Sequence, residues 1–165
     1  MLESNAFDAE ASFNDAAAVE PLDVGRVENP TFDLGQNDPG QTDSAFFQYF
    51  EDGMDGSVMK GPQGAWMLVL AARTNQFGCC LERVDVRVSV DGIDGTQYAN
   101  LRYKRRPLYP GADGQLYLMN VFVVVGDPEV WDGQFAEITF SITPDVGGQT
   151  LTDTRLLKMV RLDAT

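Results

Sequence analysis

The 165-residue chain contains no histidine. Histidine is the usual general base and the usual nitrogen ligand for metals, because its unperturbed pKa lies near neutral pH. Its absence removes every Ser-His triad. The chain also lacks both glycine-rich phosphate-binding patterns, G-x-x-x-x-G-K-[ST] and G-x-G-x-x-G. We therefore expect no enzyme. A small glycosidase that uses two carboxylates is a distant alternative.

Basic residues are scarce, since 12 lysines and arginines stand against 25 aspartates and glutamates, for a net charge of -13. Such a surplus repels nucleic acid phosphates and anionic lipid, so we expect no nucleic acid partner. The surplus is concentrated in residues 1–45, which contain ten acids and a single base, Arg26.

Residues 1–45 also contain few aromatic side chains and several prolines and glycines. A segment of this composition buries too little apolar surface to offset the entropy lost on ordering. We expect an acidic, flexible arm or linker over residues 1–45 and a folded domain over residues 46–165. Two alternatives are a short helix within residues 13–21 and docking of Phe7, Phe13 and Phe32 on the domain or on a neighbouring subunit.

Long apolar runs are absent as well. The segments WMLVLAA (66–72) and LYLMNVFVVV (116–125) are too short and too interrupted to cross a membrane, so the chain is not expected to span one. Both are apolar on two faces, which is typical of central strands.

Alternation with a period of two is the main pattern that the chain does contain. Apolar residues at 84, 86, 88 and 90, and again at 138, 140 and 142, alternate with polar ones, which indicates half-buried strands. Further strands are expected at 46–51, 97–104 and 154–162. About seven short strands without a convincing helix predict an all-β domain, a two-layer antiparallel β-sandwich that is immunoglobulin-like, with an extended acidic N-terminal arm.

The run FFQYFEDGMDGSVMKGPQGAWMLVLAART, followed by VDVRVSVDG, resembles a group of uncharacterised secreted or lipid-anchored β-sandwich proteins of myxobacteria and related bacteria. Gly61-Pro62-Gln63-Gly64 stands at the matching place before a strand, whereas Ala65 and Met67 depart from the pattern. The resemblance implies a sandwich outside the cytoplasm and no known activity. Physically, GPQG is sufficiently explained as a turn that enters a buried strand.

Cys79 and Cys80 are the only cysteines, and they are adjacent. A disulfide between neighbours is strained, and a zinc site would need further ligands. Three interpretations stay open: two free thiols, a vicinal disulfide in a turn, or a bridge to another chain.

Asp-Gly pairs recur in the segments 51–57, 91–96 and 111–115. Loop carboxylates that converge at one end of a sandwich would suit calcium, but Asp-Gly is also the ordinary hairpin turn. The only cofactor we consider is therefore calcium, with Asp52, Asp55, Asp91, Asp94 and Asp113 as candidate ligands.

A basic island, RYKRRP, occupies residues 102–107. If Tyr103 points inward, Arg102, Lys104 and Arg106 share the outer face, with Arg87 and Arg105 as neighbours. The island is either a charged edge strand that prevents self-pairing or a patch that binds an anionic glycan or the acidic arm.

We therefore predict a non-enzymatic cell-surface or periplasmic β-sandwich module with a binding or structural role. A calcium-dependent adhesion or carbohydrate-binding domain is the main alternative. A protein or a glycan would be the partner, and a lipid anchor on the full-length protein would fit the arm as a spacer.

Overall fold

A computed structural model of the chain describes residues 31–77 and 83–162, and most of these residues lie in strands. The strands are β1 (Phe32–Gln36), β2 (Gln48–Tyr49), β3 (Asp55–Lys60), β4 (Trp66–Thr74), β5 (Arg83–Gly92), β6 (Gln97–Pro107), β7 (Tyr109–Pro110), β8 (Leu116–Val124), β9 (Phe135–Pro144) and β10 (Leu151–Leu162). A 3-10 turn, η1 (Ser44–Phe46), and one short helix, α1 (Pro128–Trp131), complete the described elements. The all-β prediction is confirmed.

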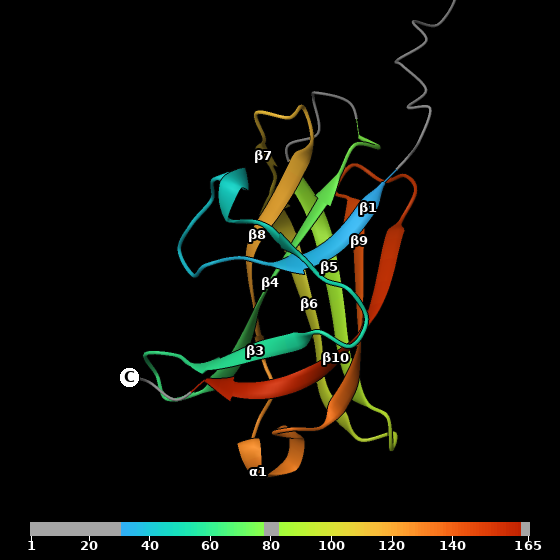
Figure 1. Cartoon of the computed structure of the whole chain (residues 1–165). Coiled ribbons are helices and arrows are strands. Elements are labelled where there is room, and N and C mark those ends of the chain that lie inside the picture. The colour runs from blue at the N-terminus through green and yellow to red at the C-terminus, as the bar shows by residue number, and fades with distance from the viewer. Residues whose placement is uncertain (1–30, 78–82, 163–165) are drawn as a thin grey trace, which may run out of the picture.

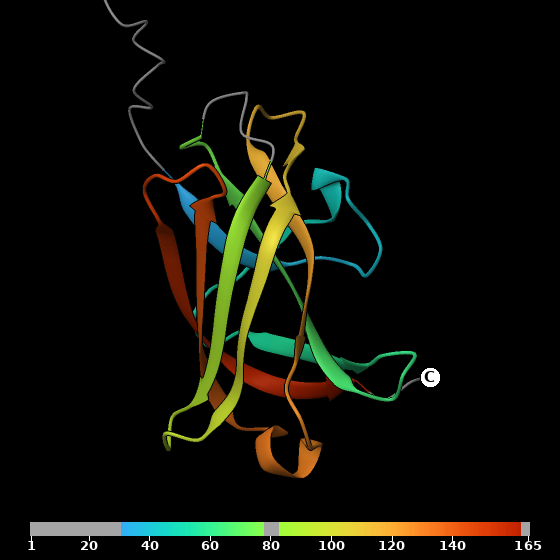
Figure 2. The same ribbon diagram turned by 180° about the vertical axis from the view of Figure 1, so that it is seen from behind.

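The ten strands form one sheet that curls into a half-barrel (Figure 1). The strand order is β2-β1-β4-β3-β10-β9-β5-β6, and β8 pairs with β4 and with β7. Seen from behind, β5, β6 and β9 form the near wall and β1, β3 and β4 lie behind them (Figure 2). The two predicted layers are therefore two halves of one curled sheet. No helix in the described ranges is long and apolar enough to cross a membrane.

One strand pair departs from the predicted antiparallel arrangement. Strands β3 and β10 run parallel, with Asp55 opposite Lys158 and Met59 opposite Leu162. The first part of the twelve-residue β10 pairs with β9, and its last part continues alone to meet β3. The last residues of β10 extend beyond its pairing with β9, and there β10 pairs with β3, whose residues lie 103 positions earlier in the chain.

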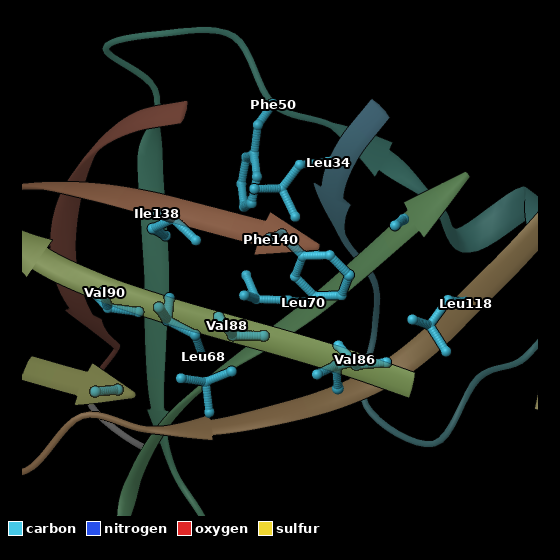
Figure 3. Close-up of a cluster of buried hydrophobic side chains, with 14 of the residues drawn as sticks. Leu34, Phe50, Leu68, Leu70, Val86, Val88, Val90, Leu118, Ile138 and Phe140 are labelled. Carbon is cyan, nitrogen blue, oxygen red and sulfur yellow. The ribbon is translucent and has the colours of Figure 1, made fainter. Parts of the chain in front are cut away.

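The core lies between the two halves of the sheet, where inward side chains from both meet (Figure 3). The alternation read from the sequence is confirmed on β5 and β9, whose inward side chains are fully or almost fully buried. They are Val84, Val86, Val88 and Val90 on β5, and Ile138, Phe140 and Ile142 on β9. Burial of each such side chain stabilises the fold by about 1.5–3 kcal/mol before entropy is counted, so these two strands anchor the domain.

The predicted boundary at residue 46 is wrong, because part of the predicted flexible arm belongs to the sheet. Strand β1 pairs with β4 from Phe32 opposite Thr74 to Gln36 opposite Leu70. Leu34 has an exposed fraction of 0%, and the ring of Phe32 lies 6.4 Å from that of Phe140. The folded part therefore reaches back at least to residue 32. Phe7 and Phe13, the other two predicted anchors, lie outside the described residues.

The short helix α1 closes the lower end of the half-barrel (Figure 1). The Asp127 carboxylate accepts a hydrogen bond from the Glu129 N–H, and Pro128 occupies the first helical turn. Trp131 follows with no exposed surface, and its ring meets that of Trp66 edge-on at 6.1 Å. This single helical turn therefore places the large apolar side chain of Trp131 at the open end of the core.

Three hairpin loops share one geometry, and one of them is the GPQG segment. In residues 61–65, 92–96 and 111–115, the N–H of the first residue bonds to the carbonyl of the fifth at 2.8, 2.7 and 2.8 Å. The fourth residue is a glycine with a φ of 84°, 87° and 78° respectively, a region that disfavours other residues. The interpretation of GPQG as a turn into a strand is confirmed, since it joins β3 to β4.

Candidate ligand-binding face

Outward side chains of β6, β5, β9 and β10 form a polar surface that carries unpaired positive charge. On β5, Arg87 alternates with the buried valines and is therefore exposed, and on β6 Arg102 and Lys104 are exposed in the same way. We call the part of this surface around Arg87, Arg102 and Lys104 the cationic face. Figure 2 views the molecule from this side.

A shallow pocket of about 360 Å³ lies on the cationic face. Its volume falls at the lower end of the range of about 300–1,000 Å³ that is usual for small-molecule sites. The lining residues come from three neighbouring strands, β5, β6 and β9, and from the loop before β10: Asp85, Arg87, Arg102, Ser141, Thr143 and Thr150. The pocket therefore combines two guanidinium groups, three hydroxyls and one carboxylate.

The two arginines stand directly opposite each other, with Arg87 paired to Arg102 in the β5–β6 register. Like charges at opposite positions of a sheet are destabilising. Within residues 31–77 and 83–162, neither arginine takes part in any ion pair of the structure. The nearby Asp85 carboxylate accepts a hydrogen bond from the backbone N–H of Arg105 at 3.0 Å. The pocket thus holds two guanidinium groups, neither of them in an ion pair, beside one carboxylate, and an anionic ligand would relieve the repulsion between the two.

A double row of hydroxyls borders the arginines along β9 and β10. Three cross-strand pairs lie within hydrogen-bond distance: Thr139 with Thr154 at 3.2 Å, Ser141 with Thr152 at 2.9 Å, and Thr143 with Thr150 at 2.8 Å. Each hydroxyl keeps a free lone pair or proton after this contact. The row thus offers both donors and acceptors to a polar ligand that lies along the strands.

The prediction that Arg106 shares the outer face is wrong. The β5–β6 register shifts between Val84 and Val86, so that Arg106 stands opposite the buried Val84. The bulge reverses the alternation, and the Arg106 side chain reaches β8, where it donates to the Asn120 carbonyl at 3.0 Å. A hydrogen bond from the Tyr103 hydroxyl to the Phe122 carbonyl joins the same two strands. Arg106 therefore helps to hold β6 beside β8 instead of serving a surface patch.

Arg105 sits at the bulge itself, with a φ of 53°. Its carbonyl accepts from Arg83, and its guanidinium lies 3.4 Å from the Asp145 carboxylate. Of the five basic residues predicted for the patch, the structure thus leaves Arg87, Arg102 and Lys104 exposed together and without a recorded ion pair.

Two of the carboxylates predicted to bind calcium accept hydrogen bonds from residues of their own loops instead. Asp94 accepts from the Thr96 N–H at 2.9 Å, and this bond lowers the pKa of the Asp94 carboxyl. Asp113 accepts from the Tyr117 hydroxyl at 2.6 Å and from the Gln115 N–H at 3.1 Å, and the tyrosine bond is the main cause of its lowered pKa. These loops lie at opposite ends of the half-barrel (Figure 1).

The other three candidate ligands are also dispersed. Asp52 accepts from the Leu156 N–H at 2.9 Å, Asp91 accepts from the Gln97 side chain at 3.2 Å, and Asp55 begins β3. The described ranges contain no group of three or more His, Cys, Asp or Glu side chains that could hold a metal ion. The structure therefore does not bring the five predicted aspartates together. Cys79 and Cys80 lie outside the described residues.

Sequence reasoning missed the hydroxyl side of the pocket. In the sequence, the polar residues between 138 and 142 indicate only the exposed side of a strand, and Thr150 lies before the last expected strand, 154–162. The signal was the matching polar alternation of EITFSIT and TLTDT, whose hydroxyls face outward together once β9 and β10 pair.

Comparisons with known proteins identify no family. No family model matches the chain, and no curated protein sequence matches it. One solved structure with a similar trace is the β-glucuronidase of Bifidobacterium dentium in complex with coumarin-3-O-glucuronide, with a TM-score of 0.33 and 9% identity over 78% of this chain. The chain spans 17% of that enzyme. So weak a likeness supports no statement about activity, and the resemblance to the myxobacterial group stays a prediction.

Proposed function

We propose that the chain is a non-enzymatic binding module that acts outside the cytoplasm and takes an anionic glycan on its cationic face. One observation carries the proposal. Arg87 and Arg102 stand opposite each other in the sheet, neither forms an ion pair, and both line a pocket that also contains three hydroxyls. Guanidinium groups bind carboxylates and sulfates through short, charge-assisted hydrogen bonds. Hydroxyl groups of Ser and Thr suit the hydroxyls of a sugar ring.

Asp85 fits the same ligand class. A carboxylate repels a simple anion, but it accepts hydrogen bonds from sugar hydroxyls. A sugar residue with one acidic group and several hydroxyls would place its anion between the arginines and its hydroxyls toward Asp85 and Ser141. The pocket contains one carboxylate, whereas glycoside hydrolysis ordinarily needs two, and this favours binding over cleavage.

The test is a binding assay with a polyuronate, a sulfated polysaccharide and a neutral dextran. We expect the two acidic polymers to bind, with an affinity that falls as salt rises, and dextran not to bind. The double variant Arg87→Gln/Arg102→Gln should weaken binding by about tenfold or more, since hydrogen bonds to charged groups contribute about 1.5–3 kcal/mol.

A matched control removes two positive charges elsewhere. Lys60 and Lys158 are exposed and lie outside the pocket lining, so Lys60→Gln/Lys158→Gln changes the net charge by the same amount. This control should retain most of the affinity. Equal loss in both variants would show that binding is only a response to total charge, and absence of binding by the unaltered chain would refute the proposal.

A further inference from the structure

The outer surface of β5, β6, β9 and β10, which Figure 2 faces, is divided by the strand register into rows of side chains that cross the strands. One row passes through the two arginines of the pocket. Arg87 stands opposite Arg102 on one side and opposite Ser141 on the other. Thr152 follows on β10, opposite Ser141. We call these four residues the cationic row.

The next row toward the carboxyl end of β5 carries no charge. It consists of Asn100, Ser89, Thr139 and Thr154, which stand opposite one another in the same way. The hydroxyls of Thr139 and Thr154 lie 3.2 Å apart, and none of the four side chains lines the pocket. At ~3.4 Å per residue, this neutral row lies about 7 Å from the cationic row. The hydroxyl surface therefore continues beyond the pocket in this direction.

A third row, about 14 Å from the arginines, is acidic. Asp91 stands opposite Glu137, and like charges at opposite positions repel each other. Among the residues that the structure describes, neither carboxylate takes part in an ion pair. Gln97, which stands opposite Asp91, donates a hydrogen bond to it at 3.2 Å. Along the strands, the outer surface thus changes from positive through neutral to negative.

We propose that the glycan places an acidic sugar over the cationic row and an uncharged sugar over the neutral row, so that the module selects chains in which acidic and uncharged sugars alternate. The inference rests on the proposed function and narrows its ligand class. An uncharged sugar finds donors and acceptors in the hydroxyls and the amide of the neutral row. A second acidic sugar finds no cation there, and it comes within the screening length of about 8–10 Å from the acidic row. Attraction in one row and repulsion in the next together give the selectivity.

The test is calorimetric titration of the chain with two polymers of equal chain length. Polygalacturonate carries an acid on every sugar, whereas hyaluronan carries one on every second sugar, and its other sugars are uncharged. Charge density alone would favour polygalacturonate, but we expect hyaluronan to bind several-fold more tightly. Equal or tighter binding of polygalacturonate would overturn the inference and leave the proposed function standing. Binding of neither polymer would refute the proposed function as well.

A pair of substitutions that keeps the net charge tests the neutral row. Ser89→Ala/Thr139→Val removes two of its hydroxyls and should weaken the binding of hyaluronan several-fold and that of polygalacturonate much less. Thr42→Val/Ser44→Ala removes two hydroxyls from the segment before β2, outside this surface, and should change neither affinity. If Ser89→Ala/Thr139→Val weakened both polymers equally, the neutral row would not hold an uncharged sugar and the inference would fail.

Removal of the acidic row should act in the opposite direction. Asp91→Asn/Glu137→Gln should raise the affinity for polygalacturonate several-fold and that for hyaluronan less. Asp38→Asn/Glu129→Gln removes two exposed acids elsewhere and should raise both affinities only slightly. An equal gain in polygalacturonate affinity from the two variants would show that the acidic row acts only through the net charge, and would overturn the selectivity assigned to it.

Discussion

At the scale of single residues, the hydroxyl of Tyr117 stabilises the ionised carboxylate of Asp113 in a hairpin loop. Its bond to Asp113 is the main cause of the lowered pKa of that carboxyl. A carboxyl whose pKa is lower in the folded than in the unfolded chain stabilises the fold above its unfolded pKa, and this stability is lost as pH falls through the folded pKa. Tyr117→Phe should therefore destabilise the protein at neutral pH and have little effect in acid. Because Asp113 is exposed, we expect less than about 1 kcal/mol.

Urea denaturation at neutral pH and well below the ordinary aspartate pKa of 3.8 measures this difference. The control is Tyr109→Phe, because the structure records no hydrogen bond from that hydroxyl in the described ranges. A destabilisation by Tyr117→Phe that is the same at both pH values would contradict the assigned role of the bond to Asp113.

Single residues also show where sequence reasoning succeeds. Alternation placed Arg87, Arg102 and Lys104 outward correctly, because side chains follow the pleat as long as pairing is regular. It failed at Arg106, since the bulge at the preceding residue, Arg105, turns that side chain toward β8. The sequence RYKRRP contains no signal for this bulge, because the bulge arises from the register in which β6 pairs with β5.

At the scale of elements, β1 gives a direct test of the fold, because the composition of residues 1–45 predicts a flexible arm and the structure places β1 in the sheet. Leu34 is fully buried among core side chains, so Leu34→Ala should cost about 2–5 kcal/mol of unfolding free energy. Leu162→Ala makes the same chemical change at a side chain that is 44% exposed, and it should cost far less. The midpoint of urea unfolding compares the two variants. Equal midpoints would show that β1 is dispensable to the fold.

The missed strands share a physical explanation. β1 contains Gly35, whose position leaves no room for a Cβ because the Gln48 carbonyl and the Phe47 ring lie against it. β3 begins with Asp55-Gly56, which is also a common turn signal. β1 and β3 pair with strands that are distant in sequence, whereas β5 and β9 show alternating apolar residues of their own. The alternating strands were therefore predicted from the sequence. Strands that form only through pairing with distant segments were not.

At the scale of the whole molecule, the pocket also depends on long-range strand pairing that the sequence alone does not predict. Arg102 belongs to the basic island of the sequence, and Arg87 was expected as its neighbour. The hydroxyls come from β9 and from the loop before β10, and only the sheet order places them beside Arg87. Long-range pairing also decides which carboxylates meet. The five aspartates considered for calcium were grouped by their Asp-Gly motif, and the curl of the sheet separates two of the loops to opposite ends.

This separation leads to the expectation for calcium. Tight binding needs six to eight oxygen ligands around one ion, and in the described ranges no three acidic side chains gather. An ion that occupies a site at a hundred times its dissociation constant would add about 2.7 kcal/mol of stability and raise the melting temperature. We expect millimolar CaCl₂ and MgCl₂ at equal ionic strength to change the melting temperature equally and slightly, because both only screen the net charge of -13. A rise specific to calcium would show that a site exists, and would favour the calcium-dependent adhesion class over the module proposed above.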